Sequence, residues 1–170
     1  MIELATLEDI VQIEKIMKSI KEEMRQEGNP QWGSTEEDYP SLKKLLDDIH
    51  KQKMVKYVEN STIKGIVSLA RDTTREYDGL LENSIEESII IHRLAIPKEY
   101  RKQNIATKLI QYAEVHAINN QVKVIKSSTE VSNLKMNNLL QREGYVWKGI
   151  YSYEDYPGTY NYYEKELEGR

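Results

Sequence analysis

The sequence contains no cysteine, which excludes disulfide bonds, thiolate metal sites and a cysteine nucleophile. Its histidines, His50, His92 and His116, are scattered without the spacing that metal ligands show, so no metal site is expected. Phenylalanine is also absent, whereas tyrosine occurs 12 times, a bias for which we have no physical explanation.

No apolar run approaches the length of a membrane span, and the first residues lack the basic and apolar regions of a signal peptide. We therefore expect a cytoplasmic protein that does not bind membranes. The formal net charge of −4 argues weakly against nonspecific binding to nucleic acids and mildly favours a cationic substrate. Such a charge is nevertheless ordinary for a soluble protein.

The chain has the length of one domain, because 170 residues can bury a substantial single core and would crowd two. Hydrophobic residues make up 39% of the sequence and charged residues 31%, which is typical of a soluble globular protein. Since the sequence shows neither a repeat nor a linker, it predicts a single domain over residues 1–170.

Residues 88–119 organise the chain. Residues 89–96 are apolar and rich in β-branched side chains, which predicts a largely buried strand that Pro97 ends. A helix is predicted from Ile105, because the apolar residues that follow recur on one helical face. These residues are Ile105, Ala106, Leu109, Ile110, Ala113 and Ala117.

The turn between this strand and helix is polar and basic, which favours an anion site. The first amides of a helix lack intrahelical acceptors and carry the positive end of the macrodipole. Arg101 and Lys102 add positive charge, and Asn104 is the non-glycine type that most readily adopts a left-handed backbone. The expected ligand is a phosphate group. The alternative is an ordinary strand-turn-helix with a solvated basic turn.

This segment resembles the pyrophosphate loop of the GNAT family, the Gcn5-related N-acetyltransferases. The family pattern is Arg/Gln-x-x-Gly-x-Gly/Ala after a strand that ends in a Leu-x-Val-like triplet. The residues that match it in order are Arg101, Lys102, Gln103, Asn104, Ile105 and Ala106, with Leu94, Ala95 and Ile96 as the triplet. Asn104 replaces the first glycine, and we expect binding to survive because backbone amides hold the phosphates.

The rest of the chain also resembles GNAT topology over nearly its full length. The segment from Asn133 to Tyr145 resembles the family signature of Asn, Leu-Tyr and Gly-Phe/Tyr, with Leu139-Leu140 in the place of Leu-Tyr. Further strands are expected at residues 2–5, 54–59, 63–71, 122–126, 145–153 and 160–167, and further helices at residues 6–27, 41–50 and 133–143. Loops are expected at residues 28–34 and 72–87. The implied class is an α/β, GNAT-like acyl-CoA N-acyltransferase fold, with a central, mixed, mostly antiparallel sheet flanked by helices.

The resemblance implies a coenzyme A site, with acetyl-CoA as the cosubstrate and no metal. Neither a dinucleotide-binding Gly-x-Gly-x-x-Gly turn nor a Gly-Lys-Ser/Thr phosphate loop is present. The resemblance places the pyrophosphate on the amides of residues 102–106 and the pantetheine arm on residues 94–96. It also places the Asn133 side chain near the pantetheine. A helix N-cap is a second, compatible role for Asn133.

Acetyl transfer to an amine needs a polarised thioester, a neutral nucleophile and a proton for the leaving thiolate. The resemblance implies that the Leu94 amide donates to the acetyl oxygen. His92 is a candidate base, or else a half-buried histidine satisfied by its neighbours. Glu87, next to Glu86, is a second candidate base or water relay, or else a solvated loop carboxylate. Leu140 occupies the position where the family often has a tyrosine acid.

Trp32 and its loop are expected to bind the substrate by covering the acceptor side, or else to cap the core. The expected acceptor is a primary amine of a small molecule or peptide, which attacks acetyl-CoA directly in a ternary complex. Two alternatives stay open. One is a catalytically weak CoA-binding regulatory module, suggested by Asn104 and Leu140, and the other is a structural or interaction domain without CoA. The terminal strands offer an edge for a homodimer.

Overall fold

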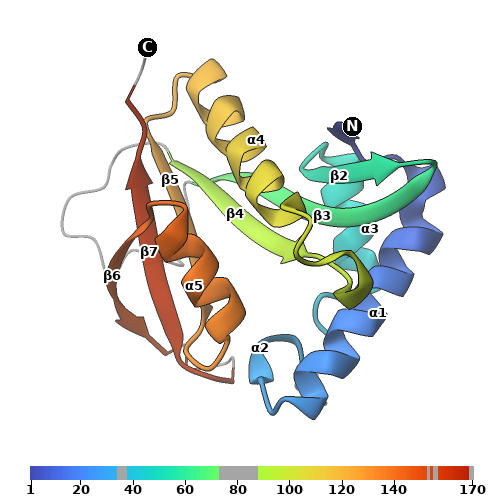
Figure 1. Cartoon of the computed structure of the whole chain (residues 1–170), viewed down its shortest axis with the longest axis horizontal. Helices are drawn as coiled ribbons and strands as arrows, with labels where there is room; N and C mark the ends of the chain where they lie inside the picture. Colours follow the sequence, from blue (N-terminus) through green and yellow to red (C-terminus); the bar gives the residue numbers. More distant parts are fainter. Residues whose placement is uncertain (34–37, 73–87, 153, 155–156, 169–170) are drawn as a thin grey trace. The chain divides into compact units, whose positions relative to one another are not determined.

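A computed structural model describes residues 1–33, 38–72, 88–152, 154 and 157–168 (Figure 1). Over these residues the strands are β1 Ile2–Leu4, β2 Met54–Glu59, β3 Thr62–Asp72, β4 Ser88–Ala95, β5 Val124–Glu130, β6 Val146–Tyr151 and β7 Tyr160–Glu166. The α-helices are α1 Ile10–Gln26, α2 Pro30–Gly33, α3 Leu42–His50, α4 Ile105–Asn119 and α5 Leu134–Arg142. Two single-turn 3₁₀ helices, η1 Leu7–Asp9 and η2 Lys98–Tyr100, precede α1 and α4.

The described strands form one mixed sheet in the order β1-β2-β3-β4-β5-β7-β6. The β1–β2, β2–β3, β5–β7 and β6–β7 pairs are antiparallel. Strands β4 and β5 are parallel, from the pair Ser88–Val124 to the pair Ile91–Ser127, and α4 supplies the crossover that a parallel pair requires. The predicted fold class, a mixed and mostly antiparallel sheet with helices, is confirmed.

The chain divides into two compact units. The first unit comprises Met1–Leu69 and His92–Leu109, and the second comprises Ala70–Ile91 and Ile110–Arg170. The end of β4, the segment after it and the first turn of α4 therefore belong to the first unit. The single domain expected over residues 1–170 stays a prediction. None of the described helices is long and apolar enough to span a bilayer.

The first unit contains a capped helix start and a β-hairpin. Asp9 accepts hydrogen bonds from the Thr6 backbone amide at 2.7 Å and from the Thr6 hydroxyl at 3.1 Å, which is the pairing that a Thr-x-x-Asp signal predicts. The β2–β3 hairpin turns at Asn60 and Ser61, whose φ angles are +50° and +59°. Two successive left-handed residues are what a tight two-residue hairpin turn requires.

A hydrophobic core holds the first unit together. It draws residues from α1, α2, α3, β2, β3 and the end of β4, and its members are Ala5, Ile13, Ile16, Met17, Ile20, Trp32, Leu45, Ile49, Met54, Ile63, Ile66 and Ala95. The prediction of a loop over residues 28–34 is wrong for Pro30–Gly33, because these residues form the short helix α2. The physical reason is packing: Trp32 is buried, and a Cβ added to Gly33 would lie 2.8 Å from the Arg25 backbone nitrogen of α1.

The second unit contains the predicted strand β5, helix α5 and the two terminal strands, with β7 between β5 and β6. Gly144 follows α5 with a φ of +85°, as expected for a helix C-cap glycine. Strand β7 buries Tyr160, Tyr162 and Tyr163. The expected loop over residues 72–87 lies outside the described residues, apart from Asp72 at the end of β3.

Candidate functional site

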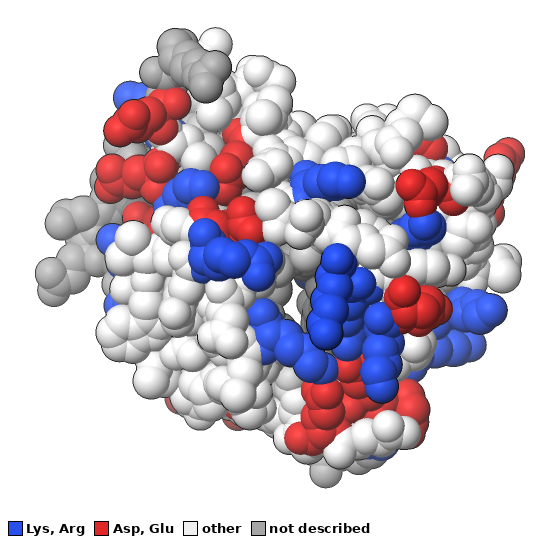
Figure 2. All heavy atoms as spheres, viewed as in Figure 1, with Lys and Arg blue, Asp and Glu red and all other residues white. Residues whose placement is uncertain are grey.

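The segment between β4 and α4 has the backbone that the sequence predicted for an anion site. Asn104, in the place of the family glycine, is left-handed with a φ of +59°, and Lys102 is left-handed with a φ of +62°. The side chains of residues 102–104 are exposed. Figure 2 shows basic side chains gathered over this segment and acidic side chains over the C-terminal part of α1 beside it.

The amides at the start of α4 are available to an anion. Lys108 N donates to Asn104 O at 3.0 Å and makes the first bond of the helix. The amides of Ile105 and Ala106 precede this bond, so they have no acceptor within the helix and lie at the positive end of its dipole. Left-handed residues in the turn before a helix create the concave runs of amides that bind anions elsewhere. The residues present thus fit a pyrophosphate.

The Arg101 side chain holds the segment in place. Its Nη1 and Nη2 each lie 2.5 Å from a carboxylate oxygen of Glu23 on α1, and its Nε donates to Ile96 O at 3.0 Å. The hydrogen bonds from Glu23 raise the pKa of Arg101 above its ordinary value, although partial burial opposes this. The guanidinium therefore contacts α1 and the residue that follows β4, while the Lys102 side chain is exposed.

Gly65 on β3 allows the start of α4 to approach the sheet closely. A Cβ added at Gly65 would lie 2.5 Å from Ile96 Cδ1, 3.0 Å from Ile105 Cγ2 and 3.4 Å from Leu109 Cδ1. Real Cβ atoms essentially never come as close as the first of these distances. Ile96, the last residue of the Leu94-Ala95-Ile96 triplet, and Ile105, the first residue of α4, can therefore pack closely against β3 because Gly65 has no side chain.

A buried ion pair lies beside the triplet. Arg93 is 7% exposed and has a φ of +51° within β4, which is rare for a non-glycine residue. Its Nε and Nη2 both lie 2.6 Å from Oδ2 of Asp48 on α3, and its Nη1 donates to Tyr39 Oη at 2.9 Å. Asp48 is fully buried and also accepts a hydrogen bond from the Ser68 hydroxyl at 2.8 Å.

The other residues predicted for the site in the first unit are His92, Leu94 and Trp32. His92 and Leu94 are half-buried on β4, and their roles as base and as amide donor stay predictions. Trp32 is 7% exposed within the core, so the structure shows its packing role, while a role in acceptor binding stays a prediction. Glu87 and Glu86 lie outside the described residues.

The second unit contains Asn133, Leu140 and Tyr145. Asn133 caps α5: its Oδ1 accepts from Met136 N at 3.3 Å and its Nδ2 donates to Thr129 Oγ1 at 3.0 Å. The N-cap role is confirmed, and contact with pantetheine stays a prediction. Leu140 is fully buried. Tyr145 is buried too, and burial raises the pKa of its hydroxyl, which makes it a weaker acid.

Three residues around the site were not singled out by the sequence: Glu23, Asp48 and Gly65. Asp48 could have been found from the sequence. It lies three residues after Leu45 on the apolar face of α3, where a carboxylate is unexpected. Gly65 carried a weaker signal as an isolated glycine inside a strand. Glu23 gave no signal, because its partner is 78 residues away in the sequence.

Within the described residues, no three His, Asp or Glu side chains lie close enough together to hold a metal ion.

Comparison with known proteins gives this geometry a family context. A GNAT-family acetyltransferase from Streptococcus agalactiae 2603 has a TM-score of 0.86 at 22% identity, over 99% of this chain and 95% of that chain. An agmatine N-acetyltransferase has a TM-score of 0.75 at 12% identity, over 98% and 99% of the two chains. A chain of the NatC complex bound to Gag peptide and CoA has a TM-score of 0.68 at 19% identity, over 99% and 98%.

At these identities the structural similarities show the fold alone, and no curated protein matches the sequence significantly. The sequence model of the acetyltransferase (GNAT) family matches residues 14–145. This match includes α4, the turn before it and all of α5. Because it covers most of the chain, the protein belongs to the GNAT acetyltransferase family.

Proposed function

We propose that this protein transfers the acetyl group of acetyl-CoA to a primary amine of a small molecule or peptide. The single observation that carries the proposal is the turn before α4, where Asn104 keeps a left-handed backbone in the place of the family glycine. Membership of the GNAT family supplies the chemistry. The conformation supplies the reason to expect that this chain still binds the pyrophosphate.

Backbone amides and the exposed Lys102 side chain make up the proposed pyrophosphate contact. The amides of residues 102–106 bind the pyrophosphate, and the exposed Lys102 side chain adds a charge beside it. Arg101 contributes by fixing the turn to Glu23 of α1 rather than by reaching the phosphate. Residues 94–96 pair with the pantetheine arm, and Asn133 adds a contact there while it caps α5.

The reaction is direct attack in a ternary complex. The amine nitrogen forms a bond to the acetyl carbon, the carbon–sulfur bond breaks, and the amine loses one proton while the thiolate gains one. The Leu94 amide donates to the acetyl oxygen and stabilises the negative charge that develops on it. His92 or Glu87 accepts the amine proton. The chain has no cysteine to carry an acetyl group between two half-reactions.

The experiment is a thiol-release assay with acetyl-CoA and a panel of amines, followed by mass spectrometry of the products. The panel contains diamines, polyamines, aminoglycosides and peptides with free N-termini. Transfer predicts release of CoA that depends on one class of amine and an acceptor that gains one acetyl group. Binding of acetyl-CoA without turnover on any amine would instead identify the CoA-binding regulatory module, for which buried Leu140 in the place of the family acid is the favouring observation.

A further inference from the structure

We propose that Asp48 is a positioning residue for acetyl transfer, because it holds Arg93 in the conformation that directs the Leu94 amide toward the acetyl oxygen. This inference rests on the proposed function, in which Leu94 is the donor. Asp48 itself would touch neither acetyl-CoA nor the amine.

The backbone of Arg93 controls the direction of the Leu94 amide. The peptide unit that follows Arg93 carries the Leu94 N–H, so the torsions of Arg93 set where this N–H points. In a regular strand, successive N–H groups alternate between the two edges. A left-handed residue interrupts this alternation and re-aims the groups next to it, as in β-bulges near active sites. At Arg93 the φ is +51°.

This conformation is costly for arginine and must be held by its surroundings. A left-handed backbone is unfavourable for a non-glycine residue, and such residues persist where neighbouring structure over-determines them. The neighbours of Arg93 come from separate elements: Asp48 from α3, and Tyr39 from the segment before α3. Ser68 of β3 in turn donates to Asp48. The guanidinium is therefore restricted to one orientation.

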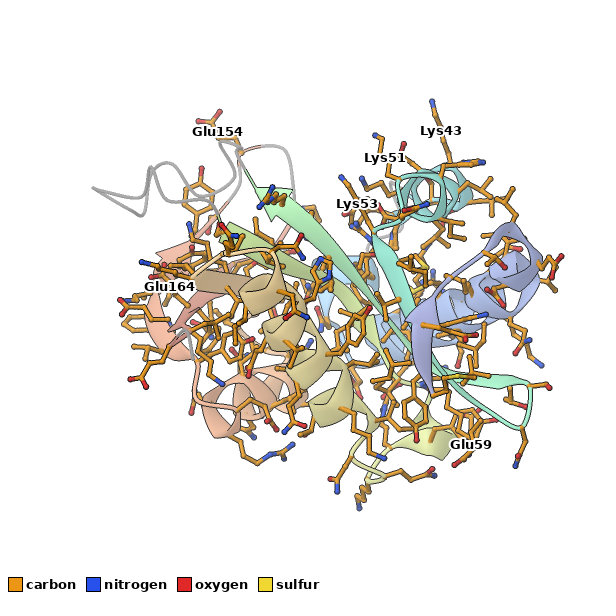
Figure 3. The ribbon with its side chains drawn as sticks, turned by 90° about the horizontal axis from the view of Figure 1, so that it is seen from above. Lys43, Lys51, Lys53, Glu59, Glu154 and Glu164 are labelled. Atoms are coloured by element: carbon orange, nitrogen blue, oxygen red, sulfur yellow. The ribbon has the colours of Figure 1, made fainter. Side chains whose placement is uncertain are left out.

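The position of Asp48 on α3 is unusual for a residue with a purely stabilising role. The outer side of α3 is basic and solvated, and Figure 3 shows Lys43 and Lys51 pointing away from the strands. The inner side buries Leu45 and Ile49 with Asp48 between them. Replacing a buried ion pair by apolar residues is often neutral or stabilising. Stability alone thus gives little reason for an Arg–Asp pair here, whereas orientation of the strand gives one.

The test is infrared spectroscopy of acetyl-CoA labelled with ¹³C at the carbonyl, bound to the parent protein and to variants. In the parent, donation by the Leu94 amide lowers the carbonyl stretching frequency relative to free acetyl-CoA. In Asp48→Asn and Arg93→Lys this shift should shrink, and kcat should fall by about tenfold or more while KM for acetyl-CoA changes little. Tyr39→Phe retains the ion pair and should give a smaller loss in the same direction.

The matched control is Ile13→Ala, a core variant of α1 in the same unit. Truncation of this fully buried side chain should lower the melting temperature about as much as removing one partner of a buried ion pair does. Its carbonyl shift should equal that of the parent. A full shift in folded Asp48→Asn and Arg93→Lys would overturn the positioning role of Asp48 and leave the proposed function standing. Bound acetyl-CoA without any shift in the parent would overturn the proposed chemistry of Leu94, and the inference with it.

Discussion

Three left-handed residues surround the candidate site: Arg93 before the Leu94 triplet, and Lys102 and Asn104 before α4. Each one turns a backbone amide away from the regular pattern of its strand or turn. Because the proposed contacts with acetyl-CoA are made by amides, the conformations of these residues matter more than their side-chain functional groups. Substitutions that change the energetic cost of each conformation should therefore change stability and acetyl-CoA affinity.

Substitution of Asn104 should separate conformation from side-chain chemistry. Asn104→Gly should leave stability and acetyl-CoA affinity nearly unchanged, because glycine adopts a positive φ without strain. Asn104→Ala should cost about 1 kcal/mol and weaken binding of acetyl-CoA. Denaturant unfolding and titration calorimetry measure the two effects. The matched control is Asn60→Ala, at an exposed asparagine of the β2–β3 turn with a φ of +50°, which should lose similar stability and keep its affinity. Equal affinity in Asn104→Ala and the parent would contradict the loop assignment.

Residue type indicated the left-handed backbone at only one of these positions. Asparagine favours that conformation, so the φ of Asn104 could be predicted from the sequence. Arginine and lysine do not favour it. The conformation of Arg93 depends on Asp48, which is 45 residues away in the sequence, and pattern reasoning over local windows does not detect such a partner.

Asp9, the residue before α1, gives a prediction for the pH dependence of stability. Burial works against the charged form of Asp9, but hydrogen bonds from Lys56 at 2.7 Å and from Thr6 outweigh it and hold the pKa of Asp9 below its ordinary value. Below that ordinary value the unfolded chain therefore binds more protons than the folded protein, and stability decreases as the pH falls through the folded pKa. Asp9→Asn should reduce stability by about 1–3 kcal/mol at neutral pH.

Denaturant unfolding between pH 2 and pH 7 measures this effect. The acid-induced loss of stability should be smaller in Asp9→Asn than in the parent, because one carboxylate no longer has to be protonated. The comparison variant is Asp47→Asn, on an exposed i, i+4 ion pair with Lys51, which should change neutral stability little. If the free energy of unfolding fell by the same amount between pH 7 and pH 2 in Asp9→Asn and in the parent, the lowered pKa of Asp9 would be ruled out as a source of the acid sensitivity.

At the scale of secondary-structure elements, contact between β3 and the start of α4 should determine both stability and cofactor binding. Gly65→Ala places a methyl group 2.5 Å from Ile96 Cδ1. Overpacking of this kind typically costs about 1–3 kcal/mol, and the displaced turn should bind acetyl-CoA more weakly. The double variant Gly65→Ala, Ile96→Val removes the clashing Cδ1 atom and should recover much of both losses. Thermal melting and calorimetry measure them. If the double variant were less stable and bound acetyl-CoA more weakly than Gly65→Ala, the contact between Gly65 and Ile96 would not explain the two losses.

The long elements could be predicted from the sequence, because periodicity and end signals act locally. The helix from Ile105 and the strand that Pro97 ends are examples, and both are observed. The turn Pro30–Gly33 could not be predicted in this way. It is short, and its helical conformation depends on burial of Trp32 and on the close approach of Gly33 to α1. Strand order is a further limit, since β7 pairs between β5 and β6 through contacts that no local window contains.

At the scale of the whole molecule, family membership and the site differ in how far the sequence determines them. Two motifs at the right separation were enough to predict the fold class and to single out the turn that we propose contacts CoA. Selection of the acceptor is a different problem. It depends on side chains brought together from distant segments, and Glu87 and the residues around it carry no motif that names an amine. The thiol-release assay addresses that question directly.

The central claim is that acetyl-CoA binds at the start of α4, and one melting experiment tests it. Ala106→Asp places a carboxylate where the pyrophosphate should lie, while an acidic residue in the first turn of a helix is otherwise favourable. The matched control is Val11→Asp, which makes the same charge change at the second residue of α1, on an exposed side chain. Both variants should melt near the parent without ligand.

The measurement is the melting temperature with and without saturating acetyl-CoA. A ligand at 100 times its Kd stabilises the folded state by about 2.7 kcal/mol, which corresponds to about 5–10 °C for a chain of this size. We predict this increase for the parent and for Val11→Asp, and its loss in Ala106→Asp. No increase in the parent, or an equal increase in all three proteins, would contradict an acetyl-CoA site at this turn.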